Sequence, residues 1–155
     1  MLNAIFSIEI TDEFDHVASY SAGVNGSIQT GNETTVANIF HDSGTLKAVG
    51  TVTNGRNQKI TIKICDENME NAIYTQDAVF EYPGYHTVIL DEEIEVTDYS
   101  IVIIFEGEAP VEGASWDDIN INYTVTASEG ESFVLVNNEW IDLVNSDDVN
   151  VRKVA

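Results

Sequence analysis

The sequence predicts one all-β domain, an antiparallel sandwich in which two sheets face each other. Short runs of β-branched and aromatic residues recur along all 155 residues, separated by Gly, Asn and Asp, and helical periodicity is scarce. The hydrophobic fraction of 43% is ordinary for a globular protein. Because a chain of this length buries roughly 70% of its unfolded surface around one core, we expect a single domain over residues 1–155.

The clearest predicted element is a hairpin. Its strands cover residues 46–53 and 59–65, and its turn contains Asn54-Gly55, a pair that accepts the positive φ angles of tight turns. In the second strand the side chains alternate between two faces. The side chains expected on the core face are Ile60, Ile62 and Ile64.

Further short strands follow from the same pattern. Residues 101–105 are apolar on both faces, which predicts a central strand covered on both sides. Asn137-Asn138 predicts a turn before residues 140–143. Segment 106–120 contains a proline and small residues and is predicted to be a long loop, a kind of segment that often carries binding. The other expected strands are 36–40, 78–82, 86–90, 100–105, 121–126, 132–136 and 149–154.

The charge is strongly negative. Asp and Glu number 27 against six Lys and Arg, giving a formal net charge of −21 at pH 7. Such a field repels phosphate backbones and anionic lipid surfaces, so we expect no nucleic-acid partner. The N-terminus lacks the basic and long apolar regions of a signal peptide, and no later segment is long enough to span a bilayer. We therefore expect no membrane insertion, with any export signal removed or outside this sequence.

Calcium is the cofactor that this charge favours, because Ca²⁺ takes six to eight oxygen ligands from loop carboxylates and carbonyls. None of the acidic clusters has the spacing of an EF-hand, so the sequence does not place the ion, and solvated turn acids are the alternative. The clusters are Asp66-Glu67, Asp91-Glu92-Glu93, Asp117-Asp118 and Asp147-Asp148.

Catalytic residues are scarce, and we expect no enzyme. Cys65 is the single cysteine, so no disulfide within the chain is possible, and it falls inside a predicted strand. Of the histidines His16, His41 and His86, the last lies in a strand, where a structural hydrogen bond is expected. No Gly-x-Ser-x-Gly elbow or His-Glu-x-x-His helix is present, and neighbouring carboxylates are common in so acidic a chain.

A candidate ligand site lies in the predicted loop 106–120. Exposed aromatic rings and nearby amide or carboxylate groups recognise sugars, the ring by stacking and the polar groups by bonding hydroxyls. The residues that combine these features are Trp116, Asp117, Asp118 and Asn120. The alternative is that Trp116 closes one end of the sandwich.

Three other aromatic residues have structural interpretations. Trp140 is expected in the core, and Tyr82 and Tyr85 are expected to pack within the turn around Pro83-Gly84. Basic residues gather in or beside the predicted hairpin, where they form either a positive strip for an acidic partner or a solvated sheet face. They are Lys47, Arg56, Lys59 and Lys63.

Several phrases along the chain resemble the lectin-like domain that accompanies papain-type cysteine proteases on bacterial and archaeal cell surfaces. In order they are Asp15-His16-Val17, Ala37-Asn38-Ile39-Phe40, Leu46-Lys47-Ala48-Val49-Gly50, Tyr82-Pro83-Gly84-Tyr85-His86-Thr87-Val88, Pro110-Val111-Glu112, Gly130-Glu131-Ser132-Phe133 and Trp140-Ile141-Asp142-Leu143.

This resemblance implies a jelly-roll-like β-sandwich, similar to lectins and carbohydrate-binding modules, on an extracellular or cell-surface protein. Its implied role is accessory, binding glycan or cell-wall polymer, or serving as a protein-interaction or spacer domain that positions a protease catalytic domain. The papain-like catalytic domain is missing from this sequence, and Cys65 lacks the glycine-rich setting of its nucleophile. The resemblance therefore does not imply that this sequence has the hydrolytic activity of those proteases.

Overall fold

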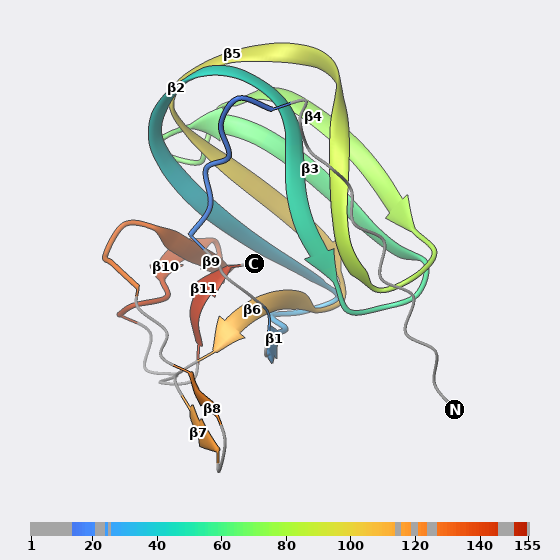
Figure 1. Cartoon of the computed structure of the whole chain (residues 1–155), viewed down its shortest axis with the longest axis vertical. Coiled ribbons are helices and arrows are strands. Elements are labelled where there is room, and N and C mark those ends of the chain that lie inside the picture. Colours follow the sequence, from blue (N-terminus) through green and yellow to red (C-terminus); the bar gives the residue numbers. More distant parts are fainter. Residues whose placement is uncertain are drawn as a thin grey trace.

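The computed structural model describes residues 14–20, 24, 26–113, 116–118, 121–123, 127–145 and 151–154, with backbone alone in 116–118, 121–123 and 151–154. Every described element is a β-strand and every pairing is antiparallel, which confirms the all-β class (Figure 1). The strands are β1 (Gly26–Ile28), β2 (Glu33–Thr53), β3 (Gln58–Asp66), β4 (Ala72–Phe80), β5 (Gly84–Glu106), β6 (Ala109–Gly113), β7 (Trp116–Asp118), β8 (Ile121–Tyr123), β9 (Ser132–Val136), β10 (Glu139–Asp142) and β11 (Val151–Val154).

The strands form three sheets. The largest has the order β10-β9-β2-β5-β3-β4, a second has the order β1-β6-β11, and β7 pairs with β8. Strand β5 contains residues 101–105 and lies between β2 and β3, so the prediction of a central strand there is confirmed.

The ribbon of β2 and β5 builds both layers of the sandwich. The two strands pair from Glu33 with Glu106 to Thr53 with Gly84, and the register shifts twice between Phe40 and Ala48. At these shifts the ribbon bends over, so that its two halves face each other (Figure 1). One buried cluster joins both halves: Val49, Val88 and Leu90 come from the folded-over half, and Val36, Ile62 and Ile103 come from the large sheet.

The predicted hairpin of residues 46–53 and 59–65 is wrong in its pairing. The chain does turn at residues 54–57, but β3 pairs with β5 and β4 and not with β2. The turn crosses from one layer to the other, and the Gln58 side chain closes it. Its Oε1 accepts hydrogen bonds from the Asn54 and Gly55 N–H groups, both at 3.1 Å, and its Nε2 donates to the carbonyl of Glu108 at 2.9 Å. The Asn-Gly pair thus indicates that the chain reverses direction. Which strands pair is decided by how apolar side chains from other parts of the sequence are buried.

The expected faces of β3 are confirmed, because Ile60, Ile62 and Ile64 are buried. On the other face of the sheet a smaller cluster is buried beneath partly buried side chains that include Trp140, so Trp140 packs on the core, as expected, but is not fully buried in it. The buried members are Ala37, Cys65 and Val102, and the covering side chains are Met69, Phe133 and Trp140.

Two segments differ from the prediction. Residues 86–90 and 100–105 belong to one strand, β5, because the acidic run between them stays extended and exposed at the bend. The predicted loop 106–120 contains β6 and β7 instead. Strand β6 is buried along its length and lies between β1 and β11, two partners that come from opposite ends of the sequence and leave no local pattern.

Candidate functional site

The predicted ligand residues of segment 106–120 lie partly outside the described residues. Trp116 pairs with Tyr123 and Asp118 with Ile121 in the β7–β8 ladder, so their backbone forms a small hairpin. Asn120, and the side chains of Trp116, Asp117 and Asp118, lie outside the described part of the structure. Their role in binding stays a prediction.

Two exposed tyrosines, Tyr82 and Tyr85, flank the turn between β4 and β5, and together they are called here the tyrosine platform. The exposed fraction of the residue is 55% for Tyr82 and 70% for Tyr85. The expectation that they pack within the turn is therefore wrong. The turn is held by other contacts, which leaves both rings available to solvent.

Tyr85 is positioned by a glycine on the neighbouring strand. Gly50 faces Thr87 in the ladder, and Tyr85 faces Val52, so the Tyr85 ring reaches diagonally across to Gly50. A Cβ atom added at Gly50 would meet the Tyr85 hydroxyl oxygen at 2.4 Å. The missing side chain at Gly50 thus creates the space in which the hydroxyl end of Tyr85 rests.

Tyr82 lies beside the turn of residues 54–57. The guanidinium carbon of Arg56 is 5.3 Å from the centre of the Tyr82 ring, a cation–π contact. The Asn57 N–H donates to the Glu81 carbonyl at 3.3 Å and ties the two turns together. The two turns at Tyr82 thus carry exposed amide, carboxylate and guanidinium groups, supplied by Asn54, Arg56, Asn57 and Glu81.

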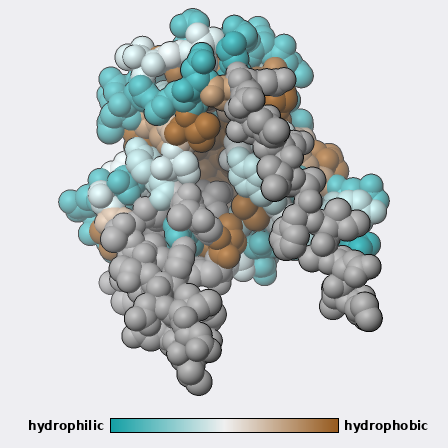
Figure 2. All heavy atoms as spheres, viewed as in Figure 1, coloured by the Kyte–Doolittle hydropathy of each residue, from teal (hydrophilic) through white to brown (hydrophobic). Residues whose placement is uncertain are grey.

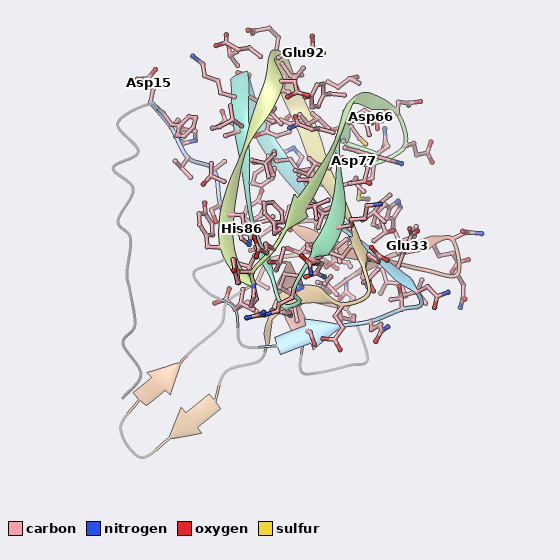
Figure 3. All side chains as sticks on the ribbon, turned by 90° about the vertical axis from the view of Figure 1, so that its right-hand side faces the viewer. Asp15, Glu33, Asp66, Asp77, His86 and Glu92 are labelled. Carbon is pink, nitrogen blue, oxygen red and sulfur yellow. The ribbon has the colours of Figure 1, made fainter. Side chains whose placement is uncertain are left out.

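His86, labelled in Figure 3, follows Tyr85 in β5 and anchors the turn that carries the platform. Its ring stacks on Phe80 with centres 3.9 Å apart, and its Nε2 lies 3.0 Å from the Thr53 hydroxyl and 3.1 Å from the Tyr82 carbonyl oxygen. These contacts confirm the structural hydrogen bond expected for His86. They also fix the backbone that carries Tyr82.

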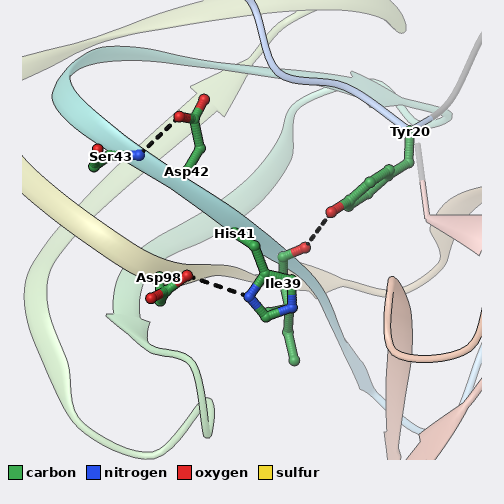
Figure 4. A network of polar contacts seen from close by, with 6 residues as sticks. All are labelled: Tyr20, Ile39, His41, Asp42, Ser43 and Asp98. Carbon is green, nitrogen blue, oxygen red and sulfur yellow. Dashed lines mark hydrogen bonds and ion pairs between the residues drawn. The ribbon is translucent and has the colours of Figure 1, made fainter.

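A cleft of about 660 Å³ lies between residues 14–18 and the bend of β2, and Gly50 and Tyr85 also line it. Tyr20 holds the N-terminal segment against β2, because its hydroxyl donates to the Ile39 carbonyl at 2.6 Å (Figure 4). Its ring also stacks on Phe40. Burial, and next the nearby Glu131 charge, raise the pKa of Tyr20. The His16 Nε2 adds a contact of 3.1 Å to the Asp42 carboxylate.

Comparison with protein families gives the classification. Residues 18–152 match the family described as the lectin-like domain. The chain belongs to this family. No curated protein matches the chain.

Two solved structures share the fold of this lectin-like domain. One is a clostridial cysteine protease, Cwp84, after propeptide cleavage, with a TM-score of 0.68 and 17% identity over 89% of this chain and 40% of that one. The other contains the cysteine protease and lectin-like domains of Cwp84, described as a surface-layer associated protein of Clostridium difficile. Its TM-score is 0.62, with 18% identity over 80% of this chain and 33% of that one. This chain thus spans less than half of either neighbour.

The part matched is a lectin-like domain and not a catalytic one. Cys65 is only 2% exposed, and burial, the largest influence on it, raises the pKa of its thiol. Within the described residues no three His, Cys, Asp or Glu side chains lie close enough to hold a metal ion. The described residues also contain no helix that is long and apolar enough to cross a membrane.

The four basic residues do not form one hairpin strip, because β5 separates β2 from β3. Lys47 pairs with Glu93 at 3.1 Å, and Arg56 lies on Tyr82. Sequence reasoning missed the tyrosine platform because aromatic residues next to Pro-Gly commonly pack within their turn. The available signal was Gly50, which lies diagonally across from Tyr85 and whose role depends on the strand register.

Proposed function

We propose that this lectin-like domain is a non-catalytic accessory module of a surface or secreted protein, and that it binds glycan or cell-wall polymer at the tyrosine platform. The exposure of Tyr82 and Tyr85 carries the proposal. Sugar rings stack on exposed aromatic faces, and sugar hydroxyls bond to amide, carboxylate and guanidinium groups. The turns beside Tyr82 supply all three kinds of group.

The shared fold with Cwp84 supports the surface location, since that neighbour is a surface-layer associated protein. The family supports a binding role, since the matched domain is lectin-like. Trp116 and its neighbours Asp117, Asp118 and Asn120 remain a second candidate for the same chemistry.

A glycan array, followed by co-sedimentation with insoluble cell-wall polymer, tests the proposal. Tyr85→Ala is expected to weaken binding at least about tenfold, or roughly 1.4 kcal/mol, because a stacking ring is lost. Gly50→Ala should weaken it as well, because the new methyl group displaces the Tyr85 hydroxyl. Ile73→Ala is the matched control, since Ile73 is exposed at the start of the edge strand β4, at the end away from the β4–β5 turn.

Trp116→Ala separates the two candidate surfaces. Loss of binding in Trp116→Ala with normal binding in Tyr85→Ala would move the site to the β7–β8 hairpin. Absence of any ligand from the array and of co-sedimentation would reject glycan binding at both.

A second candidate function is a protein-interaction or spacer domain that positions a papain-like protease domain. The solved neighbours favour it, because they combine a lectin-like domain with a cysteine protease. A papain-like domain encoded in the same polypeptide, with altered proteolysis when the lectin-like domain is deleted, is the expected result. An unchanged cleavage pattern after the deletion would count against it.

A further inference from the structure

One edge of the folded-over layer has no partner strand. Residues 45–53 of β2 pair with β5 on one side, and on the other side no strand pairs with them within the described residues. Residues 44–52 are called the free edge here. It contains no proline, and its single charged side chain, Lys47, is paired with Glu93 at 3.1 Å. Proline and unpaired lysines are common protections of edge strands, so this edge is open to a further strand.

The cleft of about 660 Å³ runs along this edge. An unbroken run of residues, 42–50, lines one wall, and residues 14–18 line the other. The floor consists of core side chains from both layers, including Val36, Val49 and Ile103. The free edge therefore lies beside the apolar side chains that form the floor of the cleft.

An extended peptide matches both features. The N–H and C=O groups of such a peptide have the same spacing along the chain as those of the free edge, so the two can form a ladder of hydrogen bonds. Alternate side chains of a strand point to the same face, so apolar residues at every second position reach the apolar floor of the cleft. At about 3.3 Å per residue, a peptide of about seven residues follows the edge from Gly44 to Gly50.

The charges around the cleft select a basic peptide. Asp15 and Asp42 line it together with His16, which contacts Asp42, and Lys47, which is paired with Glu93. The exposed acidic residues 91–93 lie at the bend, where hydrophilic residues cover the top of the molecule (Figure 2). A second copy of this chain carries a net charge of −21 and is repelled. Residues 1–13 contain Glu9, Asp12 and Glu13 and no Lys or Arg, so they fit this charge poorly.

We infer that the cleft captures an extended segment of a partner protein, with alternating apolar and basic residues, which adds as a strand to the free edge of β2. The inferred interaction rests on the main-chain groups of the free edge, whereas the proposed glycan binding rests on the exposed tyrosine rings. The two sites adjoin, because Gly50 and Tyr85 also line the cleft.

Labelled peptides test the inference directly. The probe is acetyl-Lys-Val-Thr-Val-Lys-Val-Thr-Val-Lys-amide, measured by fluorescence anisotropy against the whole chain. A version that is N-methylated at alternate amides keeps the side chains but cannot form the ladder, and should bind at least about tenfold more weakly. A version with Ser in place of Lys should also bind more weakly, because it loses the attraction of the acidic rim.

Amide hydrogen exchange locates the peptide. Saturating probe should slow the exchange of alternate amides within residues 44–52 and leave the amides of β4 unchanged. Equal binding of the N-methylated peptide, or protection elsewhere, would overturn strand addition.

Protein variants test the charge selection. The double variant Asp15→Asn with Asp42→Asn should weaken the Lys peptide several-fold and leave the Ser peptide unaffected, because only the charge attraction is removed. The matched control neutralises Glu70 and Asp77, which are exposed in the β3–β4 part of the sheet. Equal weakening by the control would show a general field effect and overturn selection by the cleft.

Two other occupants have distinct outcomes. If the probe binds only after residues 1–13 are deleted, the chain's own segment fills the cleft and the partner assignment is wrong. If the amides of residues 44–52 become protected as the protein concentration rises in the absence of peptide, a second copy of the chain fills the cleft. The assignment to a partner protein is then wrong as well.

Discussion

Cys65 shows how burial changes the chemistry of a single residue. It lies in the small cluster with Ala37 and Val102, under side chains that include Met69 and Trp140. Burial raises the pKa of its thiol, the nearby Lys63 charge acts in the opposite direction, and Asp66 raises the pKa further. Because the thiolate is the nucleophile, this environment makes Cys65 a packing residue.

Labelling of Cys65 with iodoacetamide at pH 8 is expected to be at least about tenfold slower in the native protein than in denaturant, because the thiol is both inaccessible and protonated. Mass spectrometry of the alkylated protein measures this. A free cysteine in a short peptide gives the reference rate. Equal native and denatured rates would contradict the buried position of Cys65.

At the scale of elements, the turn between β3 and β4 depends on one carboxylate. The Asp66 carboxylate accepts hydrogen bonds from the Asn71 side chain at 2.6 Å and from the Glu70 N–H at 3.2 Å. Met69 adopts a positive φ of 63° within this turn. The hydrogen bond from the Asn71 side chain is the main reason that the pKa of Asp66 is lowered, and the turn N–H groups contribute as well.

Asp66→Ala should lower the melting temperature at pH 7, and this difference should shrink in acid. A lowered folded-state pKa means that the contribution of Asp66 is present above its unfolded value of about 3.9 and is lost as the pH falls through the folded-state pKa. Thermal melts of both proteins between pH 7 and pH 2 check this. Glu67→Ala, in the same turn, is the control, and a difference that stays constant down to pH 2 would contradict the role of the carboxylate.

At the scale of the whole molecule, acidic charge is poorly compensated. The net charge is −21, and within the described residues three ion pairs are found, two of which involve histidine. Salt screens such repulsion, with a Debye length of about 10 Å at 0.1 M. The charge therefore destabilises the compact state most strongly at low salt.

The melting temperature should rise when NaCl is added, because screening weakens the repulsion. Calcium binding, which the sequence predicts, is separated from screening by comparing CaCl₂ with MgCl₂ at equal ionic strength. A site that binds only the native state stabilises it further. Identical melting temperatures in the two salts would contradict a calcium-selective site, and a melting temperature independent of NaCl would contradict the repulsion.

The all-β class, the core face of β3 and the central position of residues 101–105 could all be predicted, because alternation and two-sided apolarity are local properties of a strand. The pairing of β2 with β5 could not, since residues 53 and 84 are brought together by burial and not by the turn at Asn54-Gly55. The tyrosine platform was missed for the same reason, because the register that sets Tyr85 diagonally across from Gly50 follows from that pairing.

The sequence by itself thus determined the strand content, the faces of its clearest strand and the unsuitability of Cys65 as a nucleophile. Only the tertiary structure decided which strands are neighbours, which aromatic rings are exposed and where a strand edge is left open. The physical reason is that side-chain alternation depends on adjacent residues, whereas strand order depends on how distant apolar segments share one core.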